Sequence, residues 1–113
     1  MAMCLCQPPT IRELVVETAR EAQAVRSTAN LSTTLDQSLC ISAQKHAVNL
    51  ARARRLYHQH QGEIIGMGAR NPRDIVSVWM NPPGHRRILL SGSRVGFGCS
   101  SDGQTLYWVG LIR

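Results

Sequence analysis

The sequence of 113 residues contains few aromatic residues, which make up 4% of the chain. The core must therefore be built from Leu, Val, Ile and Ala, and we expect it to be lean. The chain also lacks any apolar run close to the ~20 residues that a membrane-spanning helix needs. Its hydrophobic content of 43% is ordinary for a globular protein and argues against disorder. At this length we expect one small domain.

The N-terminal stretch MAMCLCQPPT has neither a basic region nor the sustained apolar region of an export signal. We therefore expect the protein to be cytoplasmic or part of an assembled particle, or extracellular if a signal was removed. The chain has four cysteines but no C-x2-C pair of the zinc-binding kind. Free thiols are the default expectation without export, with Cys40 and Cys99 as small core residues. An exposed pair of Cys4 and Cys6 would be able to bridge to another chain.

Acidic residues are scarce in the C-terminal part of the chain. Residues 45–113 carry ten Lys and Arg against three acids, whereas residues 1–44 carry three Arg against four acids. This asymmetry indicates an anionic partner for the C-terminal part, such as nucleic acid, acidic lipid, a cell-wall polymer or an acidic protein face. A basic surface without a dedicated partner would explain the same charge.

Two long helices are predicted in the first half of the chain. Thr10 and Glu13 form a capping-box pattern, and apolar residues then recur at helical spacing over residues 10–29. The segment NLSTT breaks this helix. A second helix is predicted from about Asp36 to Tyr57, with a buried stripe made by Leu39, Ala43, Ala47, Leu50 and Ala51.

The second half is predicted to be shorter elements followed by a hairpin. A loop with a short strand at residues 63–67 precedes Asn71-Pro72, which is a typical start for a helix over residues 72–80. Pro82-Pro83 ends that helix, and a helical turn follows at residues 83–90. Two alternating segments flank the Asp102-Gly103 turn and predict an antiparallel hairpin. We therefore expect an α+β fold, with residues 1–9 as an N-terminal arm and residues 10–113 as a single domain.

Few side chains are suited to chemistry, and most of them are histidines: His46, His58, His60, Glu63 and His85. His58, His60 and Glu63 fall in the loop after the second predicted helix. His85 lies at the start of the helical turn that follows the third predicted helix. Imidazoles with one carboxylate are able to hold a divalent metal or to perform acid–base work near neutral pH. Each histidine taken singly is more often a surface or hydrogen-bonded residue.

Three segments stand in an order that resembles the CAP superfamily, also called the SCP domain, which includes the cysteine-rich secretory and pathogenesis-related 1 proteins. ISAQKHAVNLARARRLYH resembles the second-helix signature, and GEIIGMG resembles the Gly-Glu-Asn-Ile-Ala-x-Gly motif of bacterial members. IVSVWMNPPGHRRIL is similar to their Trp-Met…Pro-Gly-His-Arg block. RVGFGCSSDGQTLYWVGLI, which follows them, resembles the terminal hairpin. The resemblance covers nearly the whole chain from about Ile11.

The resemblance implies a small α-β-α sandwich whose cleft gathers histidines and glutamates. Carried over by position, it implies Glu63, His58 or His60, and His85 as site residues, with a divalent metal such as zinc or magnesium held by His58, Glu63 and His85. Two family positions have no match here, because Met80-Asn81 and Tyr107-Trp108 stand in their place. Ile64 replaces the motif Asn, and only four residues separate His58 from Glu63.

Two functions follow as expectations. The first is a binding or structural assembly module with a reduced cleft and a basic C-terminal surface, of a size that would suit a component of a phage-like or envelope-associated particle. The second is a hydrolase directed at the cell wall, in which Glu63 is the acid or base and His58 or His60 acts with His85, assisted by a metal. The sequence leaves open whether the protein is an enzyme at all.

Overall fold

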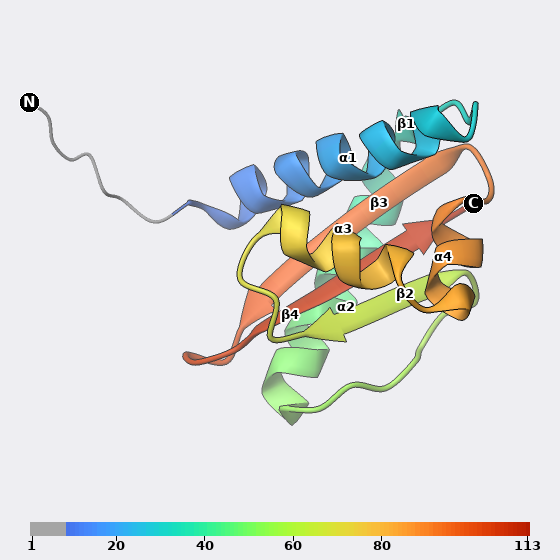
Figure 1. Cartoon of the computed structure of the whole chain (residues 1–113). Coiled ribbons are helices and arrows are strands. Elements are labelled where there is room, and N and C mark those ends of the chain that lie inside the picture. The colour runs from blue at the N-terminus through green and yellow to red at the C-terminus, as the bar shows by residue number, and fades with distance from the viewer. Residues whose placement is uncertain (1–8) are drawn as a thin grey trace, which may run out of the picture.

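The computed structural model of the chain describes residues 9–113 as three layers, with a sheet between two layers of helices (Figure 1). The elements in chain order are α1 (Ile11–Thr28), β1 (Thr34–Leu35), α2 (Gln37–Ala53), β2 (Glu63–Met67), α3 (Pro72–Met80), α4 (Pro83–Leu89), β3 (Arg94–Ser101) and β4 (Leu106–Ile112). The expected α+β class and sandwich are confirmed. The predicted arm lies almost wholly outside the described residues, and the pair Cys4 and Cys6 lies wholly outside them.

The sheet has the strand order β1-β3-β4-β2. β3 and β4 form the predicted hairpin, in which Val95 faces Ile112 and Ser101 faces Leu106. β2 pairs antiparallel with the other side of β4, and the register places Glu63 opposite Leu111. β1 runs parallel to β3 and was not predicted, because a strand of two residues is too short to show alternation.

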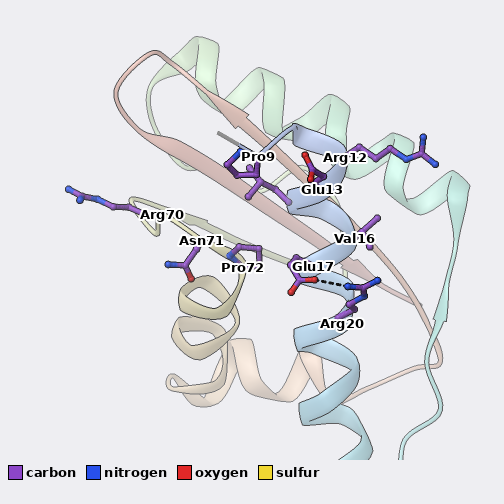
Figure 2. Close-up of a pocket in the computed structure, with 10 residues that line it drawn as sticks. Pro9, Arg12, Glu13, Val16, Glu17, Arg20, Arg70, Asn71 and Pro72 are labelled. Carbon is purple, nitrogen blue, oxygen red and sulfur yellow. Dashed lines mark hydrogen bonds and ion pairs between the residues drawn. The ribbon is translucent and has the colours of Figure 1, made fainter. Parts of the chain in front are cut away.

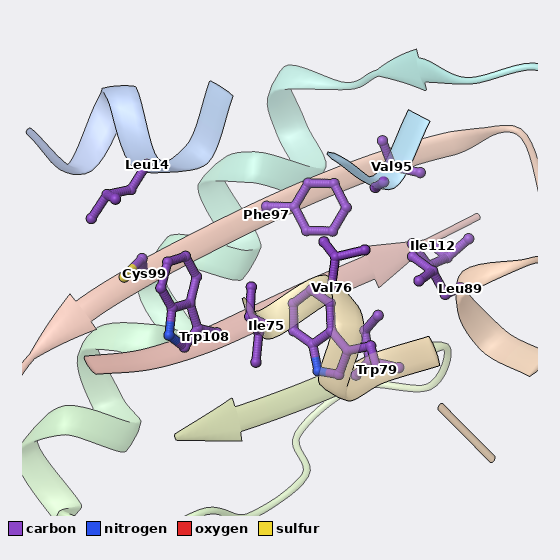
Figure 3. Packing of buried hydrophobic residues seen from close by; sticks show 12 residues of the cluster. Leu14, Ile75, Val76, Trp79, Leu89, Val95, Phe97, Cys99, Trp108 and Ile112 are labelled. Atoms are coloured by element: carbon purple, nitrogen blue, oxygen red, sulfur yellow. The ribbon is translucent and has the colours of Figure 1, made fainter. Parts of the chain in front are cut away.

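Strand alternation divides the buried side chains between two cores. On one face the rings of Phe97 and Trp108 from the sheet and of Trp79 from α3 lie in the core that α1, α3 and α4 cover (Figure 3). On the other face Tyr107, Val109 and Leu111 pack against the small residues of α2. Both faces of the sheet are therefore covered, and Trp79 is a core residue. Trp79 and Phe97 stack with ring centroids 6.0 Å apart, which partly offsets the scarcity of aromatic residues.

Glycines in β3 allow α2 to lie directly on the sheet. A Cβ atom at Gly98 would stand 2.5 Å from the backbone C of Ala43 and from the backbone N of Gln44. The amide of Gln44 then closes the outer edge of β3, because it donates to the carbonyl of Cys99 at 2.8 Å and accepts from the Cys99 N–H at 2.9 Å. An edge strand occupied in this way has no free groups at Cys99 for pairing.

The helix boundaries follow capping chemistry with one correction. The predicted capping box of Thr10 and Glu13 is present, and Asn71 caps α3 ahead of Pro72. The second helix was predicted to reach Tyr57 but ends at Ala53, because Arg54 adopts a left-handed conformation with φ 55°. The early end frees the next residues to turn back across the sheet.

Arg26 is the largest departure from the predicted hydrophobic pattern, since it lies in α1 with 0% exposure. Its guanidinium donates five hydrogen bonds, to the carbonyls of Ser32, Leu89, Ser91 and Gly92 and to the hydroxyl of Thr33. These acceptors belong to the loop after α1 and to the end of α4 and the loop that follows it. A single buried side chain therefore holds together two segments that are far apart in the sequence.

Candidate functional site

Glu63 begins β2 and is buried, with 2% of its surface exposed. Its Oε1 atom accepts two hydrogen bonds of 3.0 Å, one from Nδ1 of His58 and one from the backbone N–H of Gln59. Both donors come from the loop between α2 and β2, only four and five residues before Glu63. The short loop therefore folds back onto the carboxylate, which compensates for removing its charge from water.

His46 supplies the third side chain, from the buried face of α2. Its Nε2 atom donates to the carbonyl of Tyr57 at 2.9 Å and lies 3.5 Å from Oε2 of Glu63. A carbonyl oxygen only accepts, so Nε2 carries a proton and Nδ1 of the neutral ring holds the lone pair. Neither Nδ1 of His46 nor Oε2 of Glu63 has a hydrogen-bond partner among residues 9–113.

His58 is the part of this cluster that reaches the solvent. Its side chain is 61% exposed, whereas those of Glu63 and His46 are fully buried. Because Glu63 accepts from Nδ1, the neutral ring presents an unprotonated Nε2 to the outside. A carboxylate that fixes the tautomer of an imidazole is an arrangement suited to a general base.

The other predicted site residues are placed differently. His60 is half-buried in the loop, and its ring stands edge-on to that of His46 with centroids 6.0 Å apart. His85 lies in α4 with a buried Nδ1 that has no partner, and no hydrogen bond or ion pair joins it to Glu63 or His58 in the described part of the chain. The structure thus brings His58 and Glu63 together and leaves His85 outside their hydrogen-bonded group.

A metal site was expected at His58, Glu63 and His85. Across residues 9–113 no three His, Cys, Asp or Glu side chains form a group able to hold a metal ion. Oε1 of Glu63 is also already taken up by two N–H donors. The described residues thus show no three-ligand centre and no chemistry is assigned to a metal, and the expected metal at His58, Glu63 and His85 stays a prediction.

His46 was considered in the sequence but not carried into the predicted site. It lies three residues after Ala43 and one before Ala47, on the predicted buried stripe of α2. A histidine on an apolar stripe needs a polar partner inside the fold. This spacing indicates a buried polar partner for His46, which the structure supplies as the carbonyl of Tyr57 and the carboxylate of Glu63.

Neither cysteine in the described residues offers a nucleophile. Both are free, and burial raises the pKa of Cys99 to about 12. Burial also raises the pKa of Cys40. Both thiols are therefore protonated near neutral pH and behave as small apolar side chains, as expected from the sequence.

Four surface hollows of the described residues lie away from the Glu63 cluster. One of them opens between the beginnings of α1 and α3, where Arg12 and Glu13 line it from α1 and Pro72 lines it from α3 (Figure 2). Glu17 and Arg20 form an exposed ion pair of 3.0 Å on its rim. Three more hollows follow the outer side of α2. None of these four is lined by Glu63, His58 or His85.

Three solved structures similar to this chain share its fold at low sequence identity. An outer surface protein from Borrelia burgdorferi has a TM-score of 0.71 and 20% identity, with 84% of this chain and 86% of that chain covered. An extracellular SCP-domain protein from Bacillus anthracis has a TM-score of 0.58 and 15% identity, with 95% and 45% covered. The hookworm platelet inhibitor has a TM-score of 0.57 and 14% identity, with 95% and 73% covered.

Further comparisons bear on the family. A search of curated proteins gave no match. No helix within residues 9–113 combines the length and apolar character needed to cross a membrane. The family model described as CAP, the cysteine-rich secretory protein family, matches residues 19–112, which hold the Glu63 cluster and the hairpin. The chain therefore belongs to the CAP family.

Proposed function

We propose that this CAP domain is a binding and assembly module, in which the Glu63 cluster holds the loop between α2 and β2 in place. The observation that carries the proposal is the enclosure of the carboxylate. Glu63 is 2% exposed, and its Oε1 atom is occupied by His58 and Gln59. A carboxylate that is covered and hydrogen-bonded by its own loop has little freedom to reach a substrate.

The contacts around the cluster support a structural role for it. The His46 N–H holds the carbonyl of Tyr57, and the Arg55 guanidinium lies 4.8 Å from the centre of the Tyr57 ring. The Gly62 backbone carbonyl also accepts from the N–H of Ile112, which ties the end of the loop to β4. The cluster thus fixes a segment that has no regular secondary structure, as buried polar networks commonly do.

The charge distribution supports binding as the function. The chain has a net charge of +6, and most of its excess Arg lies in residues 45–113. Such a surface favours association with anionic partners and raises the rate of encounter. Membership of a larger phage-like or envelope-associated particle stays a prediction.

A second candidate function is favoured by one observation, the exposed His58 ring on a buried carboxylate. As a cell-wall hydrolase, the protein would use Nε2 of His58 as the general base that takes a proton from water. Glu63 would hold the tautomer and stabilise the imidazolium that forms. Glu63 itself would then act through His58, not as the acid or base expected from the sequence.

One experiment separates the two functions. Purified cell-wall sacculi are incubated with the wild type and with His58→Ala, and the release of soluble fragments is measured. Because His58 is largely exposed, we expect His58→Ala to stay folded, which its thermal melting curve checks. The binding module predicts no release above buffer by either protein. Release by the wild type that His58→Ala loses at an unchanged melting temperature would contradict the module and establish the hydrolase.

A further inference from the structure

The outer side of α2 carries a shallow groove that continues from α1 to the tip of the hairpin. One hollow lies between α1 and α2, a second lies on α2 itself, and a third reaches from α2 to Ser100–Asp102. The first and second share Ile41 and Gln44, and the second and third share Val48 and Arg52. We call this surface the α2 groove and define it by the residues Ile11, Cys40, Ile41, Gln44, Val48 and Arg52.

The α2 groove is mainly apolar in the two hollows nearer α1, whereas its hairpin end is lined largely by polar residues. Ile41 is 51% exposed and Ile11 is 39% exposed, although both are large aliphatic side chains. Val15, Val16 and Val48 line the same surface and are half-buried. Single exposed aliphatic residues are common, but a contiguous set in a hollow is typical of an interaction site.

Basic side chains border these apolar residues. Arg12 stands at the α1 end, Lys45 and Arg52 lie along α2, and Arg54 stands at the hairpin end. In the described residues, Arg12, Lys45 and Arg52 make no ion pair with a carboxylate. Asp102, the one acidic residue lining the three hollows, is already engaged by the hydroxyl of Tyr107. The surface therefore presents unpaired positive charge beside apolar area.

The spacing on α2 matches the side of a helix that receives another helix. Ile41 and Val48 are seven residues apart, and so are Lys45 and Arg52. Seven residues are two helical turns, or roughly 10 Å, so each pair forms a row along the same side of α2. An apolar row beside a charged row is the arrangement by which helices pair and choose partners.

Two other occupants are disfavoured by the same surface. An extended peptide would need free groups on the edge of β3, but Gln44 occupies both backbone groups of Cys99, and the N–H of Asp36 occupies the carbonyl of Val95. A second copy of this chain would bring one set of basic side chains against another.

We infer that the α2 groove binds an acidic amphipathic helix of another protein, with apolar residues against Ile41 and Val48 and carboxylates against Lys45 and Arg52. This inference rests on the proposed binding function and names its surface and the chemistry of its partner. Carboxylates on the partner would form pairs at the rim of the interface, which set specificity and are weakened by salt.

The test selects ligands from a display library of random helix-forming peptides on the purified full-length chain. We expect the enriched peptides to carry apolar residues at helical spacing, flanked by Asp or Glu. Ile41→Asp should weaken the binding of a synthetic enriched peptide ~10-fold or more, as substitutions at interface centres do. Arg52→Glu should also weaken this binding, because it turns an attractive pair at the rim into a repulsive one. The milder Ile41→Ala should weaken the binding of the enriched peptide less, and added salt should weaken this binding further.

Matched controls use the opposite helical layer. Val78→Asp changes an aliphatic residue that is 48% exposed on α3, and Arg73→Glu reverses an exposed charge on the same helix. Both should leave the affinity for the peptide unchanged. The melting temperature of every variant is compared with that of the wild type, so that loss of the fold is not mistaken for loss of binding.

Several outcomes would overturn the inference. Enriched peptides that bind Ile41→Asp and Arg52→Glu as tightly as the wild type would place binding elsewhere and leave the module function standing. Failure to enrich acidic apolar peptides, with binding to phosphatidylglycerol vesicles that Ile41→Asp abolishes, would assign the groove to a lipid surface. Self-association of the wild type that Ile41→Asp abolishes would assign it to a second copy. Failure of the module function itself is read from the cell-wall assay, which does not involve the groove.

Discussion

Replacing Gly98 by alanine tests the close approach of α2 to the sheet. The added Cβ would stand 2.5 Å from two backbone atoms of α2 and 2.6 Å from the carbonyl oxygen of Ala43. Real Cβ atoms do not come this close to backbone atoms, so α2 must move away or the strand must bend. Overpacking of this kind typically costs about 1–3 kcal/mol, and because rigid backbone must give way we expect about 3 kcal/mol.

Thermal unfolding followed by circular dichroism measures the effect of Gly98→Ala. For a domain near 100 residues, 1 kcal/mol shifts the melting temperature by roughly 4–8 °C, so we expect a fall of at least ~12 °C. Gly84→Ala is the matched control, because Gly84 lies within α4 with nothing near its Cβ position. There we expect a gain of about 0.5–1 kcal/mol from helix propensity. A Gly98→Ala protein as stable as the wild type would refute the close packing of α2.

Two further predictions concern polar anchors. Arg26→Met removes five hydrogen bonds and leaves their acceptors without a donor. We expect the free energy of unfolding, measured by chemical denaturation, to fall by about 3–5 kcal/mol, and Arg26→Lys to be intermediate. A fall below about 0.5 kcal/mol would contradict this role of Arg26. Hydrogen bonds from Ser38 and from the Leu39 N–H, and the contact with Arg94, lower the pKa of Asp36 to about 2. The charged form is thus favoured in the folded state, and its contribution is complete above about pH 5 and lost as the pH falls towards 2. Asp36→Asn should therefore lower the melting temperature at pH 7 and approach the wild type near pH 2, and a difference independent of pH would exclude the charge as the cause.

Local patterns in the sequence predicted most of the elements. The box of Thr10 and Glu13, the Asn71-Pro72 start and the Asp102-Gly103 turn each depend on groups a few residues apart, and all three lie where they were expected. Such signals are reliable because the chemistry that satisfies the backbone is local. The family resemblance supplied the layer order of the sandwich, which local patterns alone do not give.

Features that depend on distant parts of the chain were not predictable in this way. Arg26 has the pattern of a surface charge at the end of an amphipathic helix until the carbonyls of Leu89 and Ser91 are seen around it. The second helix was extended too far because nothing in its own composition shows that Arg54 turns left-handed. His46 was placed correctly on a helix but not in a site, since its partners Tyr57 and Glu63 meet it only after the chain reverses.

The short loop before β2 changes what the family carboxylate is able to do. With only four residues between them, His58 and Glu63 contact each other within a single chain reversal, and Gln59 adds its N–H to the same oxygen. Glu63 and His46 are buried, so His58 is the member of this hydrogen-bonded group whose ring meets the solvent. The carboxylate accepts from two groups of its own loop, and in the proposed module it orients His58 and anchors that loop. The apolar and basic surface open to a partner lies instead on α2, so we expect binding there and not at the His and Glu motif.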